Sequence, residues 1–453
     1  MKVYLQTWGC QMNAADSLRM EALLIHHKYT LVDAPDNADI MLLNTCHIRE
    51  KAYHRVVSRI GELIPFKEKN NAIIGIAGCV AQAESKKLSE ESFDIDLIFG
   101  PDHIEELPTL LEDALKKKSL VKQVQWDKDP SYHIPIDVIP PLPETGKTPW
   151  SPFINIIKGC NNFCTFCVVP YTRGREKSRS VEEILGEVQY YINRGSKEIT
   201  LLGQNVNSYG QDKSDDFSSF VELLYQISKF PELKRLRFTT SNPHDFTQSL
   251  AQAFHDIPIL CDHFHLPVQS GSDHVLGRMK RQYTQDTYLQ KVSWLKEFRP
   301  NMAFSTDIIV GFPGETDADF QETLSLMEKM EYSFVFAFKY SPRKGTPATR
   351  FKDTVDEKVQ TQRLYDLFTL QNLISCKKAE SEVNQIFDVY FLYAKYGYIY
   401  GRTSQSRLVK ISDQGLNPSE LLGKILPVKI IDIHGAEPRQ TSLNAISLLG
   451  ILI

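Results

Sequence analysis

Apolar runs that resemble β-strands alternate with helical patterns in the first part of the chain. Alternation of this kind predicts a doubly wound parallel sheet, with helices between the strands, over residues 1–116. The predicted strands are residues 3–7, 40–44, 72–77 and 96–99, and the predicted helices are residues 14–27, 50–63 and 83–88.

The alternation lapses between residues 117 and 150. Because proline fixes φ and lacks an amide hydrogen, a high density of proline favours extended, non-helical chain. We therefore interpret residues 117–150 as a linker between two domains. Its prolines are Pro130, Pro135, Pro140, Pro141, Pro143 and Pro149.

The strand and helix alternation resumes over residues 151–376. Six such units predict an open, partial (β/α)6 barrel of the TIM type, whose active site lies at the carboxyl ends of the strands. The predicted strands are residues 153–157, 198–202, 235–239, 263–266, 303–310 and 333–340.

The last part of the chain contains short β-rich runs in place of alternating strands and helices. Four short β-rich runs occupy residues 385–394, 396–403, 408–411 and 424–433, and Gly, Asn, Pro and Ser separate them. This pattern predicts a small all-β barrel over residues 377–449.

Composition limits the classes of protein that the chain can belong to. A chain of 453 residues is too long for one ordinary core, and 42% hydrophobic with 24% charged residues describes a globular protein. The net charge of −4 does not indicate a nucleic-acid binder, so any RNA contact requires a local basic patch. We find no signal-peptide pattern and no apolar run near the ~20 residues that cross a bilayer, and we expect a cytoplasmic protein with no membrane contact.

Three cysteines stand at CxxxCxxC spacing just after the first predicted strand of the central domain. Cys160, Cys164 and Cys167 lie on one loop, so their thiolates can hold three corners of a cubane iron–sulfur cluster and leave the fourth iron open. A structural zinc site normally completes four ligands, and no second cysteine pair lies near this loop. A disulfide would use two of the three thiols. The spacing favours a cluster over these alternatives.

Three further cysteines each follow a predicted strand of the first domain. Cys10, Cys46 and Cys79 would converge, because the carboxyl ends of parallel strands share one edge of the sheet. Gly9 and Gly78, which precede two of them, would let the backbone approach a bound group closely. The pattern is compatible with a second three-cysteine cluster, and equally with ordinary buried thiols.

Polar or glycine-rich loops follow four predicted strands of the central domain. They begin at Gly203, Thr240, Pro267 and Gly311. Each loop alone is also what a simple turn would contain. Four such loops on one rim of a barrel favour a ligand site.

The CxxxCxxC loop continues into Pro-Tyr-Thr-Arg-Gly at residues 170–174 and resembles the loop of the radical S-adenosylmethionine enzymes. The whole layout is similar to the methylthiotransferases of that superfamily, and most similar to their MiaB-type branch. The similar runs are residues 7–13, 49–52, 168–174, 201–207 and 266–273.

The resemblance implies two [4Fe-4S] clusters and S-adenosyl-L-methionine as both radical source and methyl donor. The Cys160/Cys164/Cys167 cluster would cleave S-adenosylmethionine, and the Cys10/Cys46/Cys79 cluster would supply the inserted sulfur. The C-terminal barrel would be a TRAM domain. The cofactor-binding residues that the resemblance implies are Gly203, Gln204 and Asn205 for the amino group, Ser241, Asn242 and Gln269 for the ribose or carboxylate, and Asp307 near the adenine.

The activity implied is methylthiolation of carbon 2 of N6-isopentenyladenosine, next to the anticodon of tRNA. A target base must leave its stack, which is easiest in a single-stranded loop, so the expected partner is a tRNA anticodon stem-loop. An electron donor such as a flavodoxin or ferredoxin is implied as well. We expect a monomer, and the sequence leaves the sulfur source open.

Other functions remain open from the sequence. Within the family, the substrate could be threonylcarbamoyl-adenosine in tRNA or an aspartate of a ribosomal protein, although residues 168–174 and 203–207 favour the isopentenyl substrate. From another class, the protein could be an iron–sulfur RNA-binding protein or redox sensor. Two positions depart from the family's pattern: His47 stands where a serine is expected, and Lys344 interrupts an Arg-Pro-Gly run.

Overall fold

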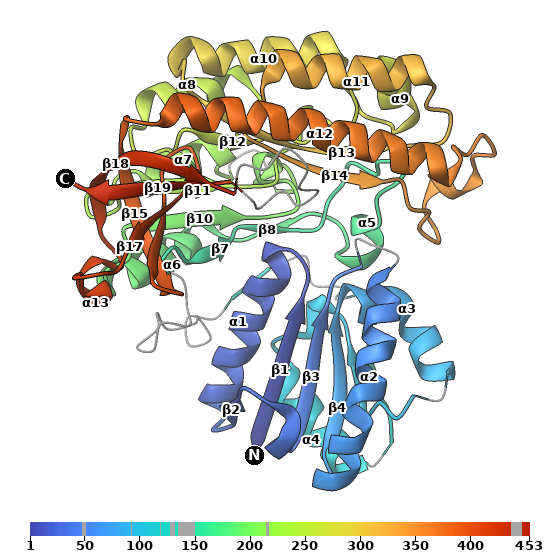
Figure 1. Cartoon of the computed structure of the whole chain (residues 1–453). Coiled ribbons are helices and arrows are strands. Elements are labelled where there is room, and N and C mark those ends of the chain that lie inside the picture. Colours follow the sequence, from blue (N-terminus) through green and yellow to red (C-terminus); the bar gives the residue numbers. More distant parts are fainter. Residues whose placement is uncertain are drawn as a thin grey trace.

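The computed structural model describes residues 1–47, 51–91, 93–117, 119–126, 132–134, 150–213, 217–435 and 446–453. Part of the run at residues 49–52 lies outside these ranges, as do most of the predicted linker and its six prolines. Figure 1 shows a sheet domain below a larger helix-covered core, with a small barrel at one side of that core.

The N-terminal domain is built on a six-stranded sheet in which all neighbouring strands are parallel. The strand order is β2-β1-β3-β4-β5-β6, so β2 and β3 lie on opposite sides of β1. The two short edge strands, β2 and β6, were not predicted. The bounds are β1 Lys2–Trp8, β2 Thr30–Val32, β3 Ile40–Thr45, β4 Ile73–Gly78, β5 Leu97–Phe99 and β6 Val121–Gln123.

Helices cover both faces of this sheet. One apolar cluster joins the strands to α1 (Gln11–His26) and α4 (Leu107–Lys117), and a second joins them to α2 (Lys51–Asn70) and α3 (Cys79–Glu90). Burial on both faces explains why β3 and β4 are continuous apolar runs rather than alternating ones.

The core contains all six predicted strands. They form two three-stranded parallel sheets, β11-β10-β7 and β12-β13-β14, and a single bridge between Leu236 and Leu260 links the two. A large apolar cluster fills the space between these sheets and the helices. The bounds are β7 Phe153–Asn155, β10 Glu198–Leu202, β11 Arg235–Phe238, β12 His263–His265, β13 Ala303–Val310 and β14 Phe334–Lys339.

Ser or Thr side chains begin the longer helices of the core. Ser180, Ser219, Thr247, Thr284 and Thr316 each accept a hydrogen bond from a backbone amide of the first helical turn. These caps satisfy amides that have no partner within the helix, and so they fix where each helix starts. The five capped helices are α6 Val181–Asn193, α7 Phe220–Ile227, α8 Gln248–Asp256, α10 Gln285–Phe298 and α11 Asp317–Met330, and the short helix α9 Asp273–Arg278 has no such cap.

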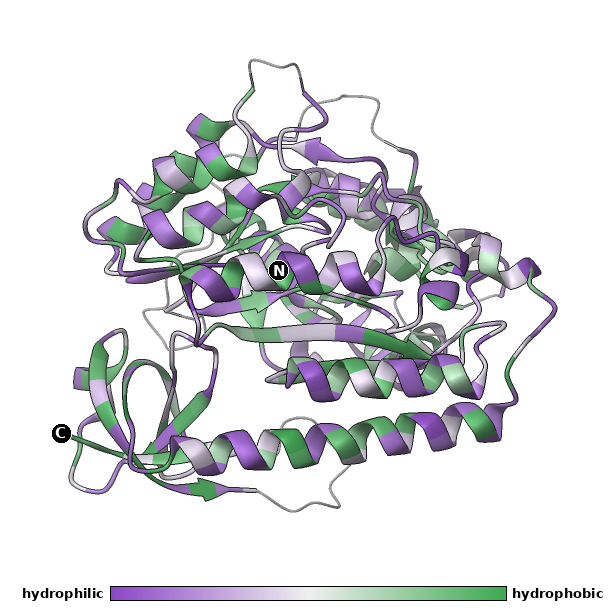
Figure 2. Cartoon of the chain, turned by 90° about the horizontal axis from the view of Figure 1, so that it is seen from above, coloured by the Kyte–Doolittle hydropathy of each residue, from purple (hydrophilic) through white to green (hydrophobic). Residues whose placement is uncertain are grey.

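A long helix, α12 (Glu357–Glu382), leads from the core into the C-terminal barrel. Figure 2 shows hydrophobic and hydrophilic positions interleaved along it, as expected of a helix packed on one side. Ala379, near its end, belongs to the apolar core of the barrel.

The C-terminal barrel is closed, with strand order β15-β16-β17-β19-β18. Parallel sheets followed by a small closed barrel were predicted, and this is confirmed. The fifth strand, β19, was not predicted, and the predicted domain end at residue 449 falls inside it. The bounds are β15 Ile386–Lys395, β16 Tyr398–Arg402, β17 Leu408–Ser412, β18 Ile425–His434 and β19 Ser447–Leu452.

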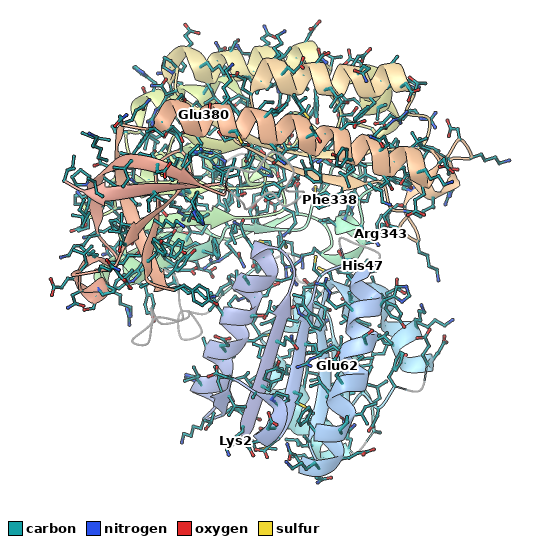
Figure 3. The ribbon with its side chains drawn as sticks, viewed as in Figure 1. Lys2, His47, Glu62, Phe338, Arg343 and Glu380 are labelled. Atoms are coloured by element: carbon teal, nitrogen blue, oxygen red, sulfur yellow. The ribbon has the colours of Figure 1, made fainter. Side chains whose placement is uncertain are left out.

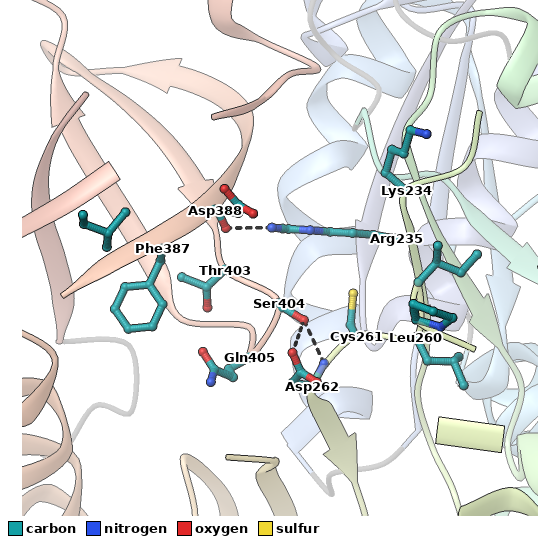
Figure 4. A pocket seen from close by; sticks show the side chains of 13 residues that line it. Lys234, Arg235, Leu260, Cys261, Asp262, Phe387, Asp388, Thr403, Ser404 and Gln405 are labelled. Atoms are coloured by element: carbon teal, nitrogen blue, oxygen red, sulfur yellow. Dashed lines mark hydrogen bonds between the residues drawn. The ribbon is translucent and has the colours of Figure 1, made fainter. Parts of the chain in front are cut away.

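The barrel docks on the amino ends of the core strands through a buried charge cluster. Glu198, at the start of β10, is fully buried, and Arg237 Nε and Arg402 Nη2 lie 2.9 and 2.5 Å from its carboxylate. Arg235 donates to the carbonyls of Arg402 and Asp388 in the barrel. A polar pocket of about 330 Å³ opens beside this cluster (Figure 4), at the opposite strand ends from the rim loops.

Among the described residues, no helix combines the length and apolar character that crossing a bilayer requires.

Candidate metal centres at the domain boundary

The CxxxCxxC loop is closed at its base by two short antiparallel strands, β8 (Ile157–Lys158) and β9 (Lys177–Ser178). Gly159 opens the loop at φ +80°, and a Cβ there would overlap the carbonyl oxygen of Arg175. Its amide donates to Gln204 Oε1 at 2.5 Å, so the loop is tied to the rim of β10. The position therefore requires glycine.

Each sulfur of this loop has an N–H donor nearby. Arg281 Nη1 lies 3.2 Å from Cys164 Sγ, the Asn162 amide nitrogen 3.5 Å from Cys160 Sγ, and the backbone nitrogen of residue 169 lies 3.4 Å from Cys167 Sγ. Donors aimed at sulfur stabilise thiolates and are typical around iron–sulfur clusters. This donor set fits a three-cysteine cluster site.

Burial raises the pKa of the Cys160 thiol and raises that of Cys167 to about 12. Without a bound cation these thiols keep their protons at neutral pH. Metal binding to such thiols must therefore release protons.

The second set of cysteines comes together at one edge of the N-terminal sheet. Cys10 precedes α1, Cys46 follows β3, and Cys79 is the first residue of α3. These residues follow β1, β3 and β4, which are neighbours in the sheet, so their carboxyl ends meet. A Cβ on Gly9 would lie 2.7 Å from Cys46 Cβ, so glycine permits this close approach.

Burial and the nearby Arg173 guanidinium shift the pKa values of the Cys10 and Cys79 thiols in opposite directions. A hydrogen bond with Cys46 lowers the pKa of the Cys10 thiol to about 6, and the Arg173 guanidinium acts in the same direction. Burial raises the pKa of Cys79, and Arg173 opposes that rise. Thiolates are the forms that bind iron, so a positive charge at this position favours metal binding.

No group of three His, Cys, Asp or Glu side chains that could hold one metal ion occurs in the part of the chain that the structure describes. A single ion requires all its ligands at about 2.0–2.3 Å from one point. A cubane cluster makes a different demand, because each cysteine binds a different iron atom.

The other predicted site residues gather at the carboxyl ends of the core strands. Asn205 accepts from the Asn242 amide at 3.1 Å, and Asn205 Nδ2 donates to Asp245 at 2.6 Å. Two polar atoms in these loops, Gln204 Nε2 and Ser241 Oγ, are buried without a hydrogen-bond partner. A buried polar group without a partner is costly, so these two atoms are available to a polar ligand.

Gln269 and Asp307 lie on adjacent chain segments of the same rim. Gln269 has φ +71° and pairs through its backbone with the segment that contains Asp307. Asp307 Oδ2 lies 3.6 Å from His265 Nε2, while His265 Nδ1 lies 2.8 Å from Ser305 Oγ. The structure thus places Asp307 inside β13 with Gln269 paired beside it, whereas Gly203, Gln204, Asn205, Ser241 and Asn242 lie in the loops that follow β10 and β11.

His47 and Lys344, the two departures from the family's pattern, lie near the boundary between the N-terminal domain and the core. His47 and Arg343 face each other across it (Figure 3). Burial, together with the nearby Arg343 guanidinium, lowers the pKa of His47 to about 4, so His47 is neutral at neutral pH. Its Nε2 lies 3.6 Å from Glu84, whereas Lys344 is exposed.

Sequence reasoning missed the arginines of both cysteine sets. Arg281 follows a short helix and carries no spacing signal, and Arg173 was quoted only as part of a similar run. Arg173 is buried, and its Nη2 lies 2.7 Å from Asp16 Oδ2 on α1. A second ion pair, Lys158 with Asp102 at 2.9 Å, crosses the same boundary.

Comparison with known proteins gives two family matches. Residues 154–327 match the Radical SAM superfamily, and residues 2–100 match the uncharacterized protein family UPF0004. A tRNA-2-methylthio-N(6)-dimethylallyladenosine synthase of Ehrlichia canis is 41% identical over 436 residues, which cover 95% of this chain and 97% of the relative. A synthase of the same name from Desulfosudis oleivorans is 44% identical over 391 residues, which cover 85% of this chain and 82% of the relative.

Two solved structures share the fold at low sequence identity. The radical S-adenosylmethionine methyltransferase TsrM from Kitasatospora setae, with cobalamin and a [4Fe-4S] cluster bound, has a TM-score of 0.56 at 14% identity and covers 77% of this chain and 76% of its own. The cobalamin-dependent S-adenosylmethionine radical enzyme OxsB has a TM-score of 0.51 at 13% identity, covering 81% of this chain and 55% of its own.

Proposed function

The chain belongs to the family of tRNA-2-methylthio-N(6)-dimethylallyladenosine synthases, and we propose that it methylthiolates carbon 2 of N6-isopentenyladenosine next to the anticodon of tRNA. The observation that carries this proposal is the placement of two three-cysteine sets on the two sides of one domain boundary. In the reaction, a hydrogen on carbon 2 is replaced by a sulfur atom that carries a methyl group.

Cys160, Cys164 and Cys167 would hold a [4Fe-4S] cluster with one open iron. When bound and reduced, this cluster with S-adenosylmethionine supplies the 5′-deoxyadenosyl radical that removes the hydrogen from carbon 2. The chain's own contribution is to stabilise the three thiolates with N–H donors, that of Arg281 among them. The fold itself, shared with enzymes that bind such clusters, agrees with this assignment.

Cys10, Cys46 and Cys79 would hold a second [4Fe-4S] cluster, which supplies the inserted sulfur. A second S-adenosylmethionine would supply the methyl group for that sulfur. The two cysteine sets, each with an arginine beside it, support a count of two clusters.

The rim residues would bind S-adenosylmethionine. Gln204 and Ser241 each carry a buried polar atom that needs a partner, and they belong to neighbouring loops. Gly203 and Asn205 flank Gln204, while Asn242, Gln269 and Asp307 complete the rim. These seven residues are the cofactor set that we propose.

The outer face of the C-terminal barrel carries the features of an RNA-binding surface. The rings of Tyr393 and Tyr400 stack at 4.9 Å, and the Nζ of the exposed Lys395 lies 4.5 Å from the centre of the Tyr396 ring. Tyr396, at the hairpin tip, is 81% exposed. Exposed aromatic rings stack on unpaired bases, and lysines contact phosphates. We propose that this TRAM-type face contacts the tRNA.

The remaining expectations complete the proposal. The domains would be residues 1–116, a linker at 117–150, the radical core at 151–376 and the TRAM barrel at 377–449, with the two core sheets acting as one partial (β/α)6 barrel beside a doubly wound N-terminal domain. The enzyme would act as a cytoplasmic monomer and take electrons from a flavodoxin or ferredoxin.

The test is anaerobic reconstitution with iron and sulfide, followed by reaction with dithionite, S-adenosylmethionine and isopentenylated tRNA. The native chain should bind about eight iron atoms. The triple Cys160/Cys164/Cys167→Ala variant should bind about four. Only the native chain should form both 5′-deoxyadenosine and methylthiolated nucleoside. Cys376→Ala, outside both sets, is the control and should match the native chain.

Other outcomes would contradict specific parts of the proposal. The chain could modify threonylcarbamoylated tRNA or a ribosomal-protein aspartate and leave isopentenylated tRNA unmodified. That result would contradict the proposed substrate. Iron binding without any cleavage of S-adenosylmethionine would instead support an iron–sulfur RNA-binding protein or redox sensor.

A further inference from the structure

Arg173 connects the two cysteine sets across the domain boundary. It belongs to the core, where it directly follows α5 (Val169–Thr172), the short helix after Cys167. Its side chain is 6% exposed, and its Nη2 lies 2.7 Å from Asp16 Oδ2 of the N-terminal domain. The Arg173 side chain thus extends from the end of the CxxxCxxC loop to the N-terminal domain.

The partner of Arg173 is fixed firmly in the N-terminal domain. Asp16 lies on α1, six residues after Cys10, and Arg19 Nη1 is 3.8 Å from its carboxylate. Arg19 also pairs with Glu105, which precedes α4. Because Asp16 is held by its own domain, the position of Arg173 is tied to the helix that begins beside Cys10.

A second contact joins the same two elements. Helix α5 packs against α3, whose first residue is Cys79. The Arg173 guanidinium lies close enough to Cys10 and Cys79 to lower the pKa of both thiols. One buried cation is therefore shared by a carboxylate and two sulfur atoms.

Each cysteine set has an arginine, which is buried at Arg173 and partly buried at Arg281, but the two arginines differ in origin. Arg281 reaches Cys164 from within the core, and so it serves its own domain. Arg173 serves cysteines that belong to the other domain. A buried guanidinium is costly unless it is paired, and removing its partners leaves that charge uncompensated. Arg173 pairs with Asp16 on the helix that follows Cys10, and α5 packs against the helix that begins at Cys79, so its placement ties the docked arrangement of the two domains to the segments that carry these cysteines.

We propose that Arg173 is a positioning residue that holds the Cys10/Cys46/Cys79 set, in its metal-binding form, against the loop of Cys160, Cys164 and Cys167. This inference rests on the proposed function for its second cluster. Arg173 would keep the sulfur-supplying set facing the site where hydrogen is removed. Its loss would therefore uncouple radical formation from sulfur insertion.

The rival explanation is a simple ion pair that joins two domains. Lys158 and Asp102 provide the comparison, because they form a buried ion pair at 2.9 Å across the same boundary. Asp102→Asn removes that pair. If Arg173 only joined the domains, Arg173→Met and Asp102→Asn would have the same consequences.

The first measurement is retention of iron by each set separately, in the full chain. In the Cys160/Cys164/Cys167→Ala background, Arg173→Met should speed iron loss to a chelator at least about tenfold, and Arg173→Lys less. In the Cys10/Cys46/Cys79→Ala background, Arg173→Met should leave iron loss unchanged. Asp102→Asn should change neither rate.

The second measurement compares the two products in the chain with all six cysteines. Arg173→Met should keep 5′-deoxyadenosine formation within about twofold and reduce methylthiolated nucleoside at least about tenfold. Asp16→Asn should also lower the ratio of methylthiolated nucleoside to 5′-deoxyadenosine. This variant keeps the test decisive if Arg173→Met does not fold.

Equal iron loss from both sets, or the same effect from Asp102→Asn, would overturn the inference. Failure of the proposed function looks different. A native chain that makes no methylthiolated nucleoside, or that binds only about four irons, contradicts the function. The iron-retention comparison still decides the role of Arg173 wherever the Cys10 set binds iron.

Discussion

Replacing Glu198 by glutamine tests whether the buried charge cluster holds the C-terminal barrel on the core. Glu198 is fully buried, and burial alone would raise the pKa of its carboxyl. The three surrounding guanidinium groups, led by that of Arg402, outweigh burial and lower the pKa from 4.5 to about 2. At ~1.4 kcal/mol for each pH unit, this difference corresponds to about 3 kcal/mol in favour of the folded state, and the share that favours docking is the part that Arg402 supplies, because Arg235 and Arg237 belong to the core.

We therefore expect Glu198→Gln to lower the free energy of barrel opening at pH 7 by no more than about 3 kcal/mol, since only the Arg402 interaction is lost when the barrel opens. The effect depends on pH with a definite sign. Because the folded-state pKa is lowered, the stabilisation is complete above the unfolded value of 4.5 and is lost as the pH falls through about 2. The difference between native and variant chains should shrink over that range.

The assay is amide hydrogen exchange, which reports the opening of each part of a chain of several domains. Exchange in β15–β18 should accelerate in the variant, while exchange in the N-terminal sheet stays unchanged. Glu90→Gln, which removes an exposed ion pair with Lys86, is the control and should have almost no effect. Unchanged protection of the barrel in Glu198→Gln, or a loss spread evenly over all domains, would refute the reasoning.

Three further substitutions test the metal and RNA sites. Arg281→Met removes the donor 3.2 Å from Cys164 Sγ and should reduce 5′-deoxyadenosine formation about tenfold or more, measured by chromatography of the reaction products. Gly159→Ala places a Cβ on a backbone carbonyl at φ +80°, and iron bound by the Cys160 set should be lost in colorimetric analysis. Tyr400→Ala removes a stacked ring and should weaken tRNA binding by about 1–3 kcal/mol in a filter-binding titration.

Each of these three substitutions has a matched control. Lys280→Met changes the exposed cation beside Arg281 and should leave radical formation unchanged. Gly186→Ala adds a methyl group to α6 where no atom lies within 4 Å, and should be neutral or stabilising. Tyr365→Ala removes a 53% exposed ring from α12 and should not affect tRNA binding. An effect of a control as large as that of its partner would contradict the corresponding assignment.

The strands that position the cysteines could be predicted from the sequence, because fully buried strands read as continuous apolar runs. Residues 40–44 and 72–77 are of this kind, and Cys46 and Cys79 follow them closely. The edge strands β2 and β6 have three residues each and are partly exposed, so they are too short to show a period. The fifth barrel strand, β19, is separated from β18 along the chain, and its pairing with β17 and β18 depends on barrel closure.

Side-chain partners between distant segments could not be predicted. Nothing near Arg173 in the sequence points to Asp16, because their contact exists only once the two domains have docked. The same holds for Glu198 and Arg402, which lie in different domains. Sequence spacing identifies ligands that lie on one loop. The charged residues that shift the pKa of those ligands lie far away in the sequence and contact them only in the folded chain.

The long helix α12 also sets the distance between the rim of the core and the C-terminal barrel. It starts near the rim, where Gln360 contacts the Gly311 carbonyl, and ends inside the barrel with Ala379. Its 26 residues correspond to about 39 Å at ~1.5 Å per residue. A substrate gripped by the barrel while its target base sits at the rim must bridge that span. A rigid double-helical stem would hold a reactive base at such a distance from the barrel, so the distance itself would favour molecules that contain one.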